Sequence, residues 1–198
     1  EALSHYAGDF VVATAGPALE SVLAAKGAGA VTLSKELDRP VLHMDIGGGT
    51  ANLALIEQGR ITATTCLNVG GRLMKISPEG RLTYVSPVLR GIFQKQTGEV
   101  VNREEVLELC EKLVRALEAA AGLRENGTLT QKLRTVGAAV FPPPKDAVIS
   151  FSGGVADCIS REISSSVAFR LSWRITSPQF SGQMRLPISK RRARSESS

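Results

Sequence analysis

Short apolar runs separated by glycine-rich segments predict that much of this chain forms β-strands. Residues 9–13, 41–46 and 148–151 are apolar and contain β-branched or aromatic side chains, a composition typical of buried strands. Residues 53–56 form another apolar run, and in residues 60–69 apolar positions alternate with polar ones. We therefore expect several short strands.

The segment from Asp45 to Val69 has the pattern of a β-hairpin. Two predicted strands flank Gln58-Gly59, a pair that suits a tight turn between antiparallel strands. Three consecutive glycines, residues 47–49, stand at the entrance to this hairpin. The glycines should therefore lie at one end of the sheet.

Two segments have the 3.6-residue period of amphipathic helices. In residues 17–29, Pro17 suits the first helical position and Leu19, Val22, Leu23 and Ala25 are expected to form the buried face. Such a helix should end near Gly27 or Gly29, since glycine is common just past a helix end.

The second and clearer helix is expected over residues 102–122. Asn102 is a candidate N-cap, and Glu105 three residues later completes the arrangement of a capping box. An apolar stripe follows at helical spacing: Val106, Leu109, Cys110, Leu113, Val114 and Leu117. Strands and helices together predict an α/β lobe with a mixed sheet and flanking helices.

The amino-acid composition describes the core and the charge distribution of the chain. The chain has 198 residues, of which 43% are hydrophobic and only 5% aromatic, so the core should be mainly aliphatic. The net charge of +5 is uneven, because from Arg161 onward eight basic residues face two acidic ones. The Ser/Arg-rich residues 161–198 have no sustained period and are expected to be poorly ordered. A basic tail alone does not predict nucleic-acid binding, so we do not expect that partner.

Cysteine and histidine usage predicts neither a disulfide framework nor a zinc site. Cys66, Cys110 and Cys158 are widely spaced and form no Cys-x-x-Cys pair, and His5 and His43 are isolated. No apolar run approaches the roughly 20 residues of a membrane span, and the first residues do not resemble a signal peptide. We expect a cytoplasmic location, reduced thiols and no membrane partner.

The triple glycine is the main candidate for chemistry. In a Rossmann fingerprint or a P-loop, glycines lead from a strand into a helix. Here a strand is expected to follow, and no Walker lysine is present. Backbone N–H groups of Gly47, Gly48 and Gly49 can instead form an anion-binding nest, with positive φ angles. Thr50 would add a hydroxyl, and Asp45 would hold Mg²⁺ through water. A glycine-rich hairpin loop without a ligand is the alternative.

Four segments in order resemble landmarks of the actin-like ATPase superfamily, which includes the Hsp70 chaperones and sugar kinases. The segment LHMDIGGGTANLAL (residues 42–55) is similar to the second phosphate motif. TAGPALESVLAAKGAGA (14–30) resembles the helix that precedes that motif, and LNVGGRL (67–73) resembles a Gly-Gly helix start. VISFSGGVADC (148–158) resembles the adenosine motif.

Within that superfamily, residues 3–160 resemble the ethanolamine ammonia-lyase reactivating factors, the EutA family. The resemblance implies an ATP-dependent, chaperone-like protein that releases damaged cobalamin from the lyase, in the cytoplasm and with a possible microcompartment association. It implies ATP/ADP and Mg²⁺ as cofactors and the lyase as partner. The residues implied for the phosphates and Mg²⁺ are Asp45, Gly47, Gly48, Gly49 and Thr50. Those implied for ribose and adenine are Gly70, Gly71, Ser152, Gly153 and Gly154.

Three departures from the family pattern limit these expectations. No Asp-Gly-Thr phosphate loop precedes the match, so we expect a fragment that lacks the first lobe and binds ATP weakly alone. Gly16-Pro17 stands where Hsp70-type chains have an acidic residue, and no catalytic residue can be assigned. Residues after about Ile163 do not continue the family pattern, so we expect them to be either a translation artefact, such as a frameshift, or an unrelated terminus.

The expected organisation has three parts. Residues 1–40 would link from the first lobe, residues 41–160 would form the second lobe, and residues 161–198 would form the tail. Two functions remain open for the nucleotide site. The first is reactivation of the lyase with weak ATPase activity in the whole protein, and the alternative is a small-molecule kinase of the same superfamily.

Overall fold

A computed structural model describes residues 16–135 and 143–156 of the chain. The strand expected over residues 9–13 and the tail 161–198 lie outside the described residues, as do Asp157 and Cys158. The helices are α1 (Pro17–Gly27), α2 (Ala30–Leu37), α3 (Arg103–Ala120) and α4 (Thr128–Leu133), with a short 3₁₀ helix at Pro87–Leu89. The strands are β1 (Val41–Ile46), β2 (Ala51–Glu57), β3 (Arg60–Leu67), β4 (Met74–Ile76), β5 (Leu82–Val85) and β6 (Val148–Ser152).

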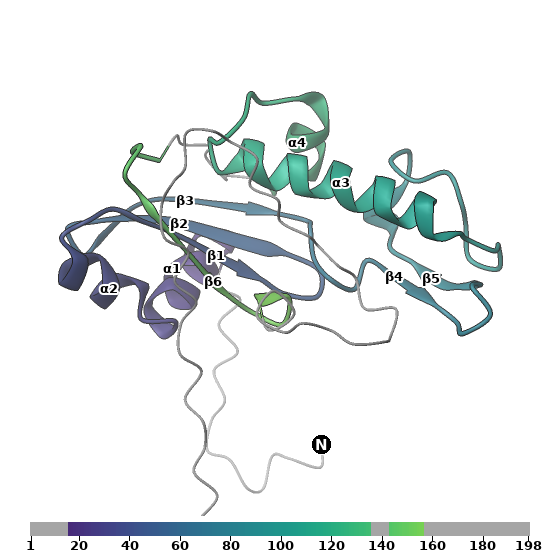
Figure 1. The fold of residues 1–198 in the computed structure, drawn as a ribbon, viewed down its shortest axis with the longest axis horizontal. Helices are drawn as coiled ribbons and strands as arrows, with labels where there is room; N and C mark the ends of the chain where they lie inside the picture. Colours follow the sequence, from purple (N-terminus) through teal and green to yellow (C-terminus); the bar gives the residue numbers. More distant parts are fainter. Residues whose placement is uncertain (1–15, 136–142, 157–198) are drawn as a thin grey trace, which may run out of the picture.

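A four-stranded mixed sheet organises the fold. Its strand order is β3-β2-β1-β6. The strands β1, β2 and β3 pair antiparallel, whereas β6 joins the other side of β1 in parallel. Figure 1 shows α1 and α2 on one face of this sheet and α3 with α4 on the other. The predicted mixed α/β class is confirmed, as is the hairpin after Asp45, because β2 begins directly after Thr50.

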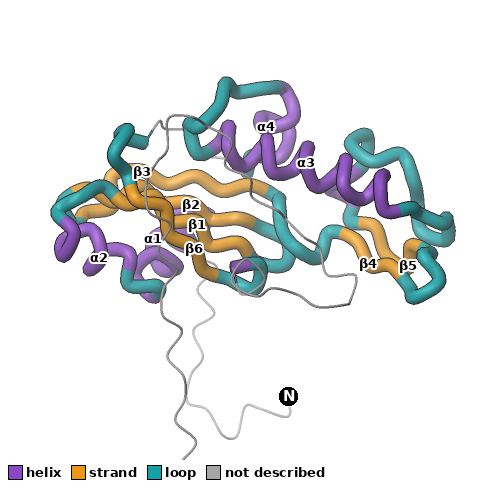
Figure 2. The backbone as a smooth tube through the Cα atoms, in the orientation of Figure 1, coloured by secondary structure: helices purple, strands orange, loops and turns teal. Residues whose placement is uncertain are grey.

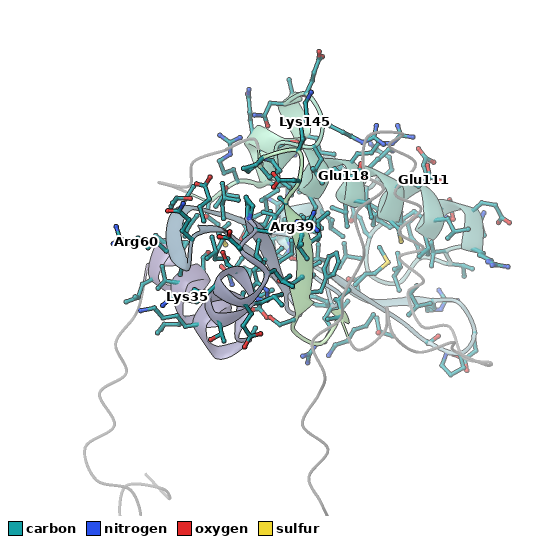
Figure 3. The ribbon with its side chains drawn as sticks, turned by 60° about the vertical axis from the view of Figure 1, so that its left-hand side comes forward. Lys35, Arg39, Arg60, Glu111, Glu118 and Lys145 are labelled. Atoms are coloured by element: carbon teal, nitrogen blue, oxygen red, sulfur yellow. The ribbon has the colours of Figure 1, made fainter. Side chains whose placement is uncertain are left out.

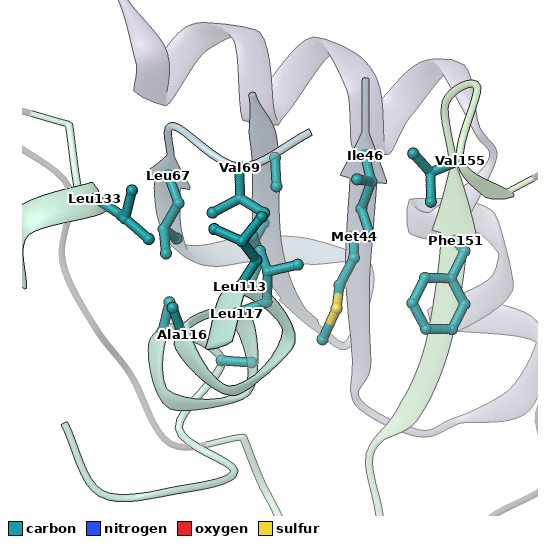
Figure 4. Close-up of a cluster of buried hydrophobic side chains, with 14 of the residues drawn as sticks. Met44, Ile46, Leu67, Val69, Leu113, Ala116, Leu117, Leu133, Phe151 and Val155 are labelled. Carbon is teal, nitrogen blue, oxygen red and sulfur yellow. The ribbon is translucent and has the colours of Figure 1, made fainter. Parts of the chain in front are cut away.

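The α3 face of the sheet buries the larger hydrophobic cluster. Leu113, Ala116 and Leu117 of α3 lie against Met44 and other side chains of the sheet (Figure 4). The predicted capping box begins this helix, because the Asn102 side chain accepts from the N–H of Glu105 and the Glu105 carboxylate accepts from the N–H of Asn102. Charged side chains such as Glu111 project outward from the fold (Figure 3).

The buried face of the first helix differs from the prediction. Leu19 and Leu23 are 48% and 56% exposed, whereas Ser21 and Ala25 are buried against the sheet. Small side chains allow α1 to lie close to β2 and β3, which explains why the periodicity of large apolar residues identified the wrong face. The chain then turns at Gly29, whose φ is 76°, and continues into α2, which the sequence pattern did not separate from α1.

The Gly-Gly helix start expected at residues 70–71 is also wrong. The chain turns there and continues into β4, which pairs with β5 in a separate two-stranded sheet. Figure 2 shows this small sheet beyond the end of the main one, on the side of the triple-glycine turn. The glycines at 70 and 71 therefore serve a turn, and the next α-helix is α3.

Candidate functional site

The triple glycine forms the turn between β1 and β2. The N–H of Gly47 donates to the carbonyl of Thr50 over 2.9 Å, which closes the hairpin. Among the described residues, no acceptor receives the N–H of Gly48 or Gly49. These two donors, rather than that of Gly47, are therefore available to an anion.

The glycines in this turn are needed for space rather than for backbone conformation. None of residues 47–49 has a φ in the left-handed range, contrary to the expectation of positive values. A Cβ on Gly48 would lie 2.9 Å from Nε of Arg72, whereas a Cβ on Gly49 would meet no atom within 4 Å. The space at Gly49 is thus open to an approaching ligand, and the space at Gly48 is taken by a guanidinium group.

A second glycine turn packs directly against the first. The N–H of Gly71 donates to the carbonyl of Gly47 over 3.0 Å, and the N–H of Arg72 donates to that of Gly48 over 2.8 Å. A Cβ on Gly70 would lie only 2.5 Å from the carbonyl group of Gly48, so this approach requires glycine. The predicted residues Gly70 and Gly71 therefore do lie beside the triple glycine, as packing partners of its backbone.

A third glycine turn follows β6 and crosses the end of β1. The N–H of Val155 donates to the carbonyl of Ile46 over 3.2 Å (both side chains are labelled in Figure 4). Gly153 has a φ of 85°, and a Cβ there would lie 2.4 Å from the Ile46 carbonyl oxygen and 3.0 Å from Oδ1 of Asp45. Both its conformation and its neighbours thus demand glycine. Gly153 and Gly154 are exposed on the outer side of this turn.

Asp45 lies where these three turns meet. Its half-buried carboxylate accepts a hydrogen bond at Oδ1 from the hydroxyl of Ser152, its neighbour on β6. No hydrogen bond from the described residues reaches Oδ2. One oxygen is therefore fixed by the protein, and the other can accept from a ligand or a metal-bound water.

His43 completes a polar line on the same face of the sheet. Its Nδ1 lies 2.9 Å from the hydroxyl of Ser150 and its Nε2 lies 3.0 Å from that of Ser152. The ring is only 1% exposed, and this burial lowers the pKa of His43 to about 4 although the charge of Asp45 acts to raise it. His43 is therefore neutral near pH 7.

The site residues suggested by the sequence are thus brought together in one region. Asp45, residues 47–50, residues 70–71 and residues 152–154 all lie at the carboxyl ends of β1 and β6. Two further side chains, His43 and Arg72, lie in the same region and were not among the site residues expected from the sequence. The sequence did not point to His43, because the pair His43–Asp45 and the pair Ser150–Ser152 lie side by side only when β1 and β6 pair in the observed register.

The described residues fit a phosphate and a water-bound cation better than a metal bound directly by protein. No group of three or more His, Cys, Asp or Glu side chains converges in the part of the chain that the structure describes. Two unpaired backbone donors, one guanidinium and one carboxylate oxygen instead suit a hydrated Mg²⁺-phosphate group. None of the described helices is both long and apolar enough to span a membrane.

Two known proteins similar to this chain are named ethanolamine ammonia-lyase reactivases. The chain is 42% identical over 165 residues to ethanolamine ammonia-lyase reactivase EutA of Escherichia coli (strain K12), a match that covers 79% of this chain and 34% of that protein. It is 41% identical over 172 residues to ethanolamine ammonia-lyase reactivase EutA of Salmonella typhimurium (strain LT2), with the same coverage. The chain therefore spans about a third of the length of these curated relatives.

A solved structure and a family model were also matched. The chain resembles MreB 5 of Spiroplasma citri bound to AMPPNP, with 21% identity and a TM-score of 0.34 over 69% of this chain and 47% of that one. A TM-score this low does not establish a shared fold, so the fold is judged from the strand order and helix positions of this chain. The family model described as ethanolamine utilisation protein EutA matches residues 1–172. This chain belongs to the EutA family of ethanolamine utilisation proteins.

Proposed function

We propose that this chain contributes a nucleotide-phosphate site to an ATP-dependent reactivase of ethanolamine ammonia-lyase. The observation that carries the proposal is the meeting of three glycine turns at Asp45, with the N–H groups of Gly48 and Gly49 unpaired among the described residues. Backbone donors that the surrounding turns hold in place bind phosphate oxygens without any reorganisation.

Each part of the site would have a distinct task. The N–H groups of Gly48 and Gly49, with the Thr50 hydroxyl, would bind phosphate oxygens of ATP or ADP. The Arg72 guanidinium, which lies against Gly48, would add positive charge beside them. The free oxygen of Asp45 would accept from a water of Mg²⁺, and the bound Mg²⁺ would neutralise part of the phosphate charge.

The glycines that follow β6 would face the nucleoside end. Gly153 and Gly154 are exposed, and neither presents a side chain that would block a ribose or a flat base. Gly70 and Gly71 would act indirectly, by allowing the second turn to support the triple glycine from behind. The hydroxyl of Ser152 would hold Asp45 rather than the ribose, because its single proton is already donated.

The link to the lyase rests on the relatives. Both are named ethanolamine ammonia-lyase reactivases, and this chain shares about two fifths of its residues with them over the matched region. We accordingly propose the lyase as partner, a cytoplasmic location and a role in exchanging damaged cobalamin. The nucleotide would control the grip on the lyase through a change between two conformations.

Calorimetric titration with Mg-ADP tests the site. The chain should bind, and Gly49→Ala should abolish most of the binding, because the added methyl group enters the open space beside the free N–H groups. Gly127→Ala is the matched control, since a Cβ there also meets no atom within 4 Å but lies far away in the loop before α4. Equal affinity of the two variants would refute the phosphate site.

A recovery assay tests the wider role. Ethanolamine ammonia-lyase is inactivated and then incubated with the chain, ATP, Mg²⁺ and fresh adenosylcobalamin, with the E. coli reactivase as positive control. Recovered lyase activity that Gly49→Ala lowers and Gly127→Ala does not would support reactivation. Phosphorylation of an added alcohol without recovery would instead favour the small-molecule kinase.

A further inference from the structure

A line of four hydrogen-bonded side chains connects the interior of the sheet to the proposed phosphate site. Ser150 contacts His43, His43 contacts Ser152, and Ser152 contacts Asp45. The parallel register explains the arrangement, because His43 pairs with Ser150 and Asp45 pairs with Ser152 on adjacent strands. All four side chains lie on one face of the sheet, since strand residues two apart point to the same side.

The direction of each hydrogen bond in this line is set by the carboxylate of Asp45 at its end. An ionised carboxylate only accepts, so the single proton of the Ser152 hydroxyl must be donated to Asp45. The Ser152 oxygen can then only accept from Nε2 of His43, which must carry a hydrogen. In a neutral imidazole the other nitrogen is an acceptor, so Nδ1 receives the proton of the Ser150 hydroxyl.

Burial makes this direction hard to reverse. His43 is 1% exposed and Ser150 is 4% exposed, so water cannot readily replace a missing partner. The opposite tautomer of His43 would draw the Ser152 proton toward Nε2 and leave Oδ1 of Asp45 without its donor. Because a buried polar group without a partner destabilises the fold, this tautomer is disfavoured.

We propose that His43 is a positioning residue for the Mg-nucleotide site: it keeps the Ser152 hydroxyl donating to Asp45 and so directs the other carboxylate oxygen of Asp45 to the hydrated cation. The inference rests on the proposed function for its consequence, but the hydrogen-bond direction stands independently of any nucleotide. His43 touches neither the cation nor the phosphates. Its effect passes through Ser152, which joins the strand that bears Asp45 to the strand that leads into the Gly153 turn.

The first experiment measures the tautomer directly. Nitrogen-15 NMR of the histidine rings in the nucleotide-free chain should show His43 neutral near pH 7, with hydrogen on Nε2. The assignment comes from the signals lost in His43→Gln. Ser152→Ala should reduce the preference for this tautomer, because the acceptor of Nε2–H is removed. Hydrogen on Nδ1 of the unmodified chain would overturn the inference, whether or not the chain binds nucleotide.

The second experiment separates positioning from general support of the fold. His43→Leu should weaken Mg-ADP binding about tenfold, the effect of roughly one hydrogen bond, while ADP without Mg²⁺ should bind within about twofold of the unmodified chain. His43→Gln should recover most of the affinity, because its amide N–H₂ can take the place of Nε2–H. Loss of Mg-ADP and Mg-free ADP binding in equal measure, or the absence of recovery by glutamine in a folded variant, would overturn the proposal.

Ser34→Ala is the matched control for the loss of a buried hydrogen-bonding side chain. Ser34 is fully buried on the same side of the sheet, where its hydroxyl donates to the carbonyl of Arg39 over 2.9 Å, away from the site. It should lower thermal stability without altering Mg-ADP affinity. If Gly49→Ala binds as well as the unmodified chain, the proposed function fails, whereas normal Mg-ADP binding by His43→Leu refutes only the role of His43.

Discussion

The two faces of the central sheet have different compositions and different tasks. The face under α3 is largely apolar, with Leu42, Met44 and Ile46 of β1 all in the larger hydrophobic cluster. The opposite face is apolar only at one end, where Val41 and other side chains pack against α1 and α2. Toward the glycine turns that second face becomes polar: His43, Asp45, Asn52, Ser150 and Ser152.

This difference shows how one small sheet could support both the stability of the fold and the proposed phosphate site. Burial of apolar area contributes roughly 25 cal/mol per Å², so the largely apolar α3 face is the main source of stability. Buried polar groups are tolerated only when they are hydrogen-bonded. On the polar half, each hydroxyl and ring nitrogen of the line to Asp45 has a partner, which makes that half rigid at little cost in stability.

The largest expected effect is on the α3 face. Leu117 of α3 is 1% exposed and faces the sheet, so Leu117→Ala should lower the free energy of unfolding by about 2–5 kcal/mol through lost burial and a residual cavity. Leu107→Ala on the same helix is the control, because that side chain is 40% exposed and should cost well under 1 kcal/mol. Urea denaturation of both variants measures the difference, and similar costs would contradict the assignment of the buried face.

A smaller loss of stability, with a larger loss of binding, is expected at the glycine turns. Gly70→Ala places a methyl group 2.5 Å from the Gly48 carbonyl group, and such overpacking typically costs about 1–3 kcal/mol. The shift of the triple glycine should reduce Mg-ADP affinity more than the stability change alone would. Thermal unfolding and calorimetry on Gly70→Ala and Gly127→Ala provide the comparison. A Gly70→Ala variant with normal affinity would show that the second turn does not support the first.

The capping box should affect the stability of α3 and not the proposed nucleotide site. Asn102→Ala removes the side chain that accepts from the Glu105 N–H and should cost about 1 kcal/mol. Because α3 covers the face of the main sheet opposite the one that bears Asp45, Mg-ADP affinity should be unchanged. Denaturation and titration of the same preparation test both statements, and a fall in affinity would mean that the two faces are not independent.

The smallest expected effect is a pH dependence at the same cap. The N–H of Asn102 and the ammonium group of Lys95 hold the pKa of Glu105 below its ordinary value of 4.5. A lowered carboxylate pKa stabilises the fold above the ordinary pKa, and that contribution disappears as pH falls through the lowered value. Glu105→Gln should therefore be less stable than the unmodified chain at pH 7, and the difference should shrink as the pH falls below 4.5 and through the lowered pKa of Glu105. A gap independent of pH in urea denaturation would contradict the role of the charge.

Sequence patterns predicted an element best when a single local feature, such as an apolar run or a capping residue, was enough to identify it. The run at residues 41–46, the turn at Gln58-Gly59 and the capping box at Asn102 were all recognisable because each depends on near neighbours in the chain. The face of α1 was not, because Ser21 and Ala25 are buried for their small size rather than for their hydrophobicity. The helix start expected at Gly70 came from the family resemblance, whereas the turn found there depends on the contacts of residues 70–72 with Gly48.

Sequence by itself determined the apolar strands, the position of the glycine turns and the similarity to the EutA family, since these depend on residue type and local spacing. Only the tertiary structure placed His43 and Ser150 in line with Asp45, and only it set Arg72 against Gly48. The physical reason is sequence distance. Hydrogen bonds between β1 and β6 join residues more than a hundred positions apart, and no local pattern specifies which strand will pair with which, or in what register.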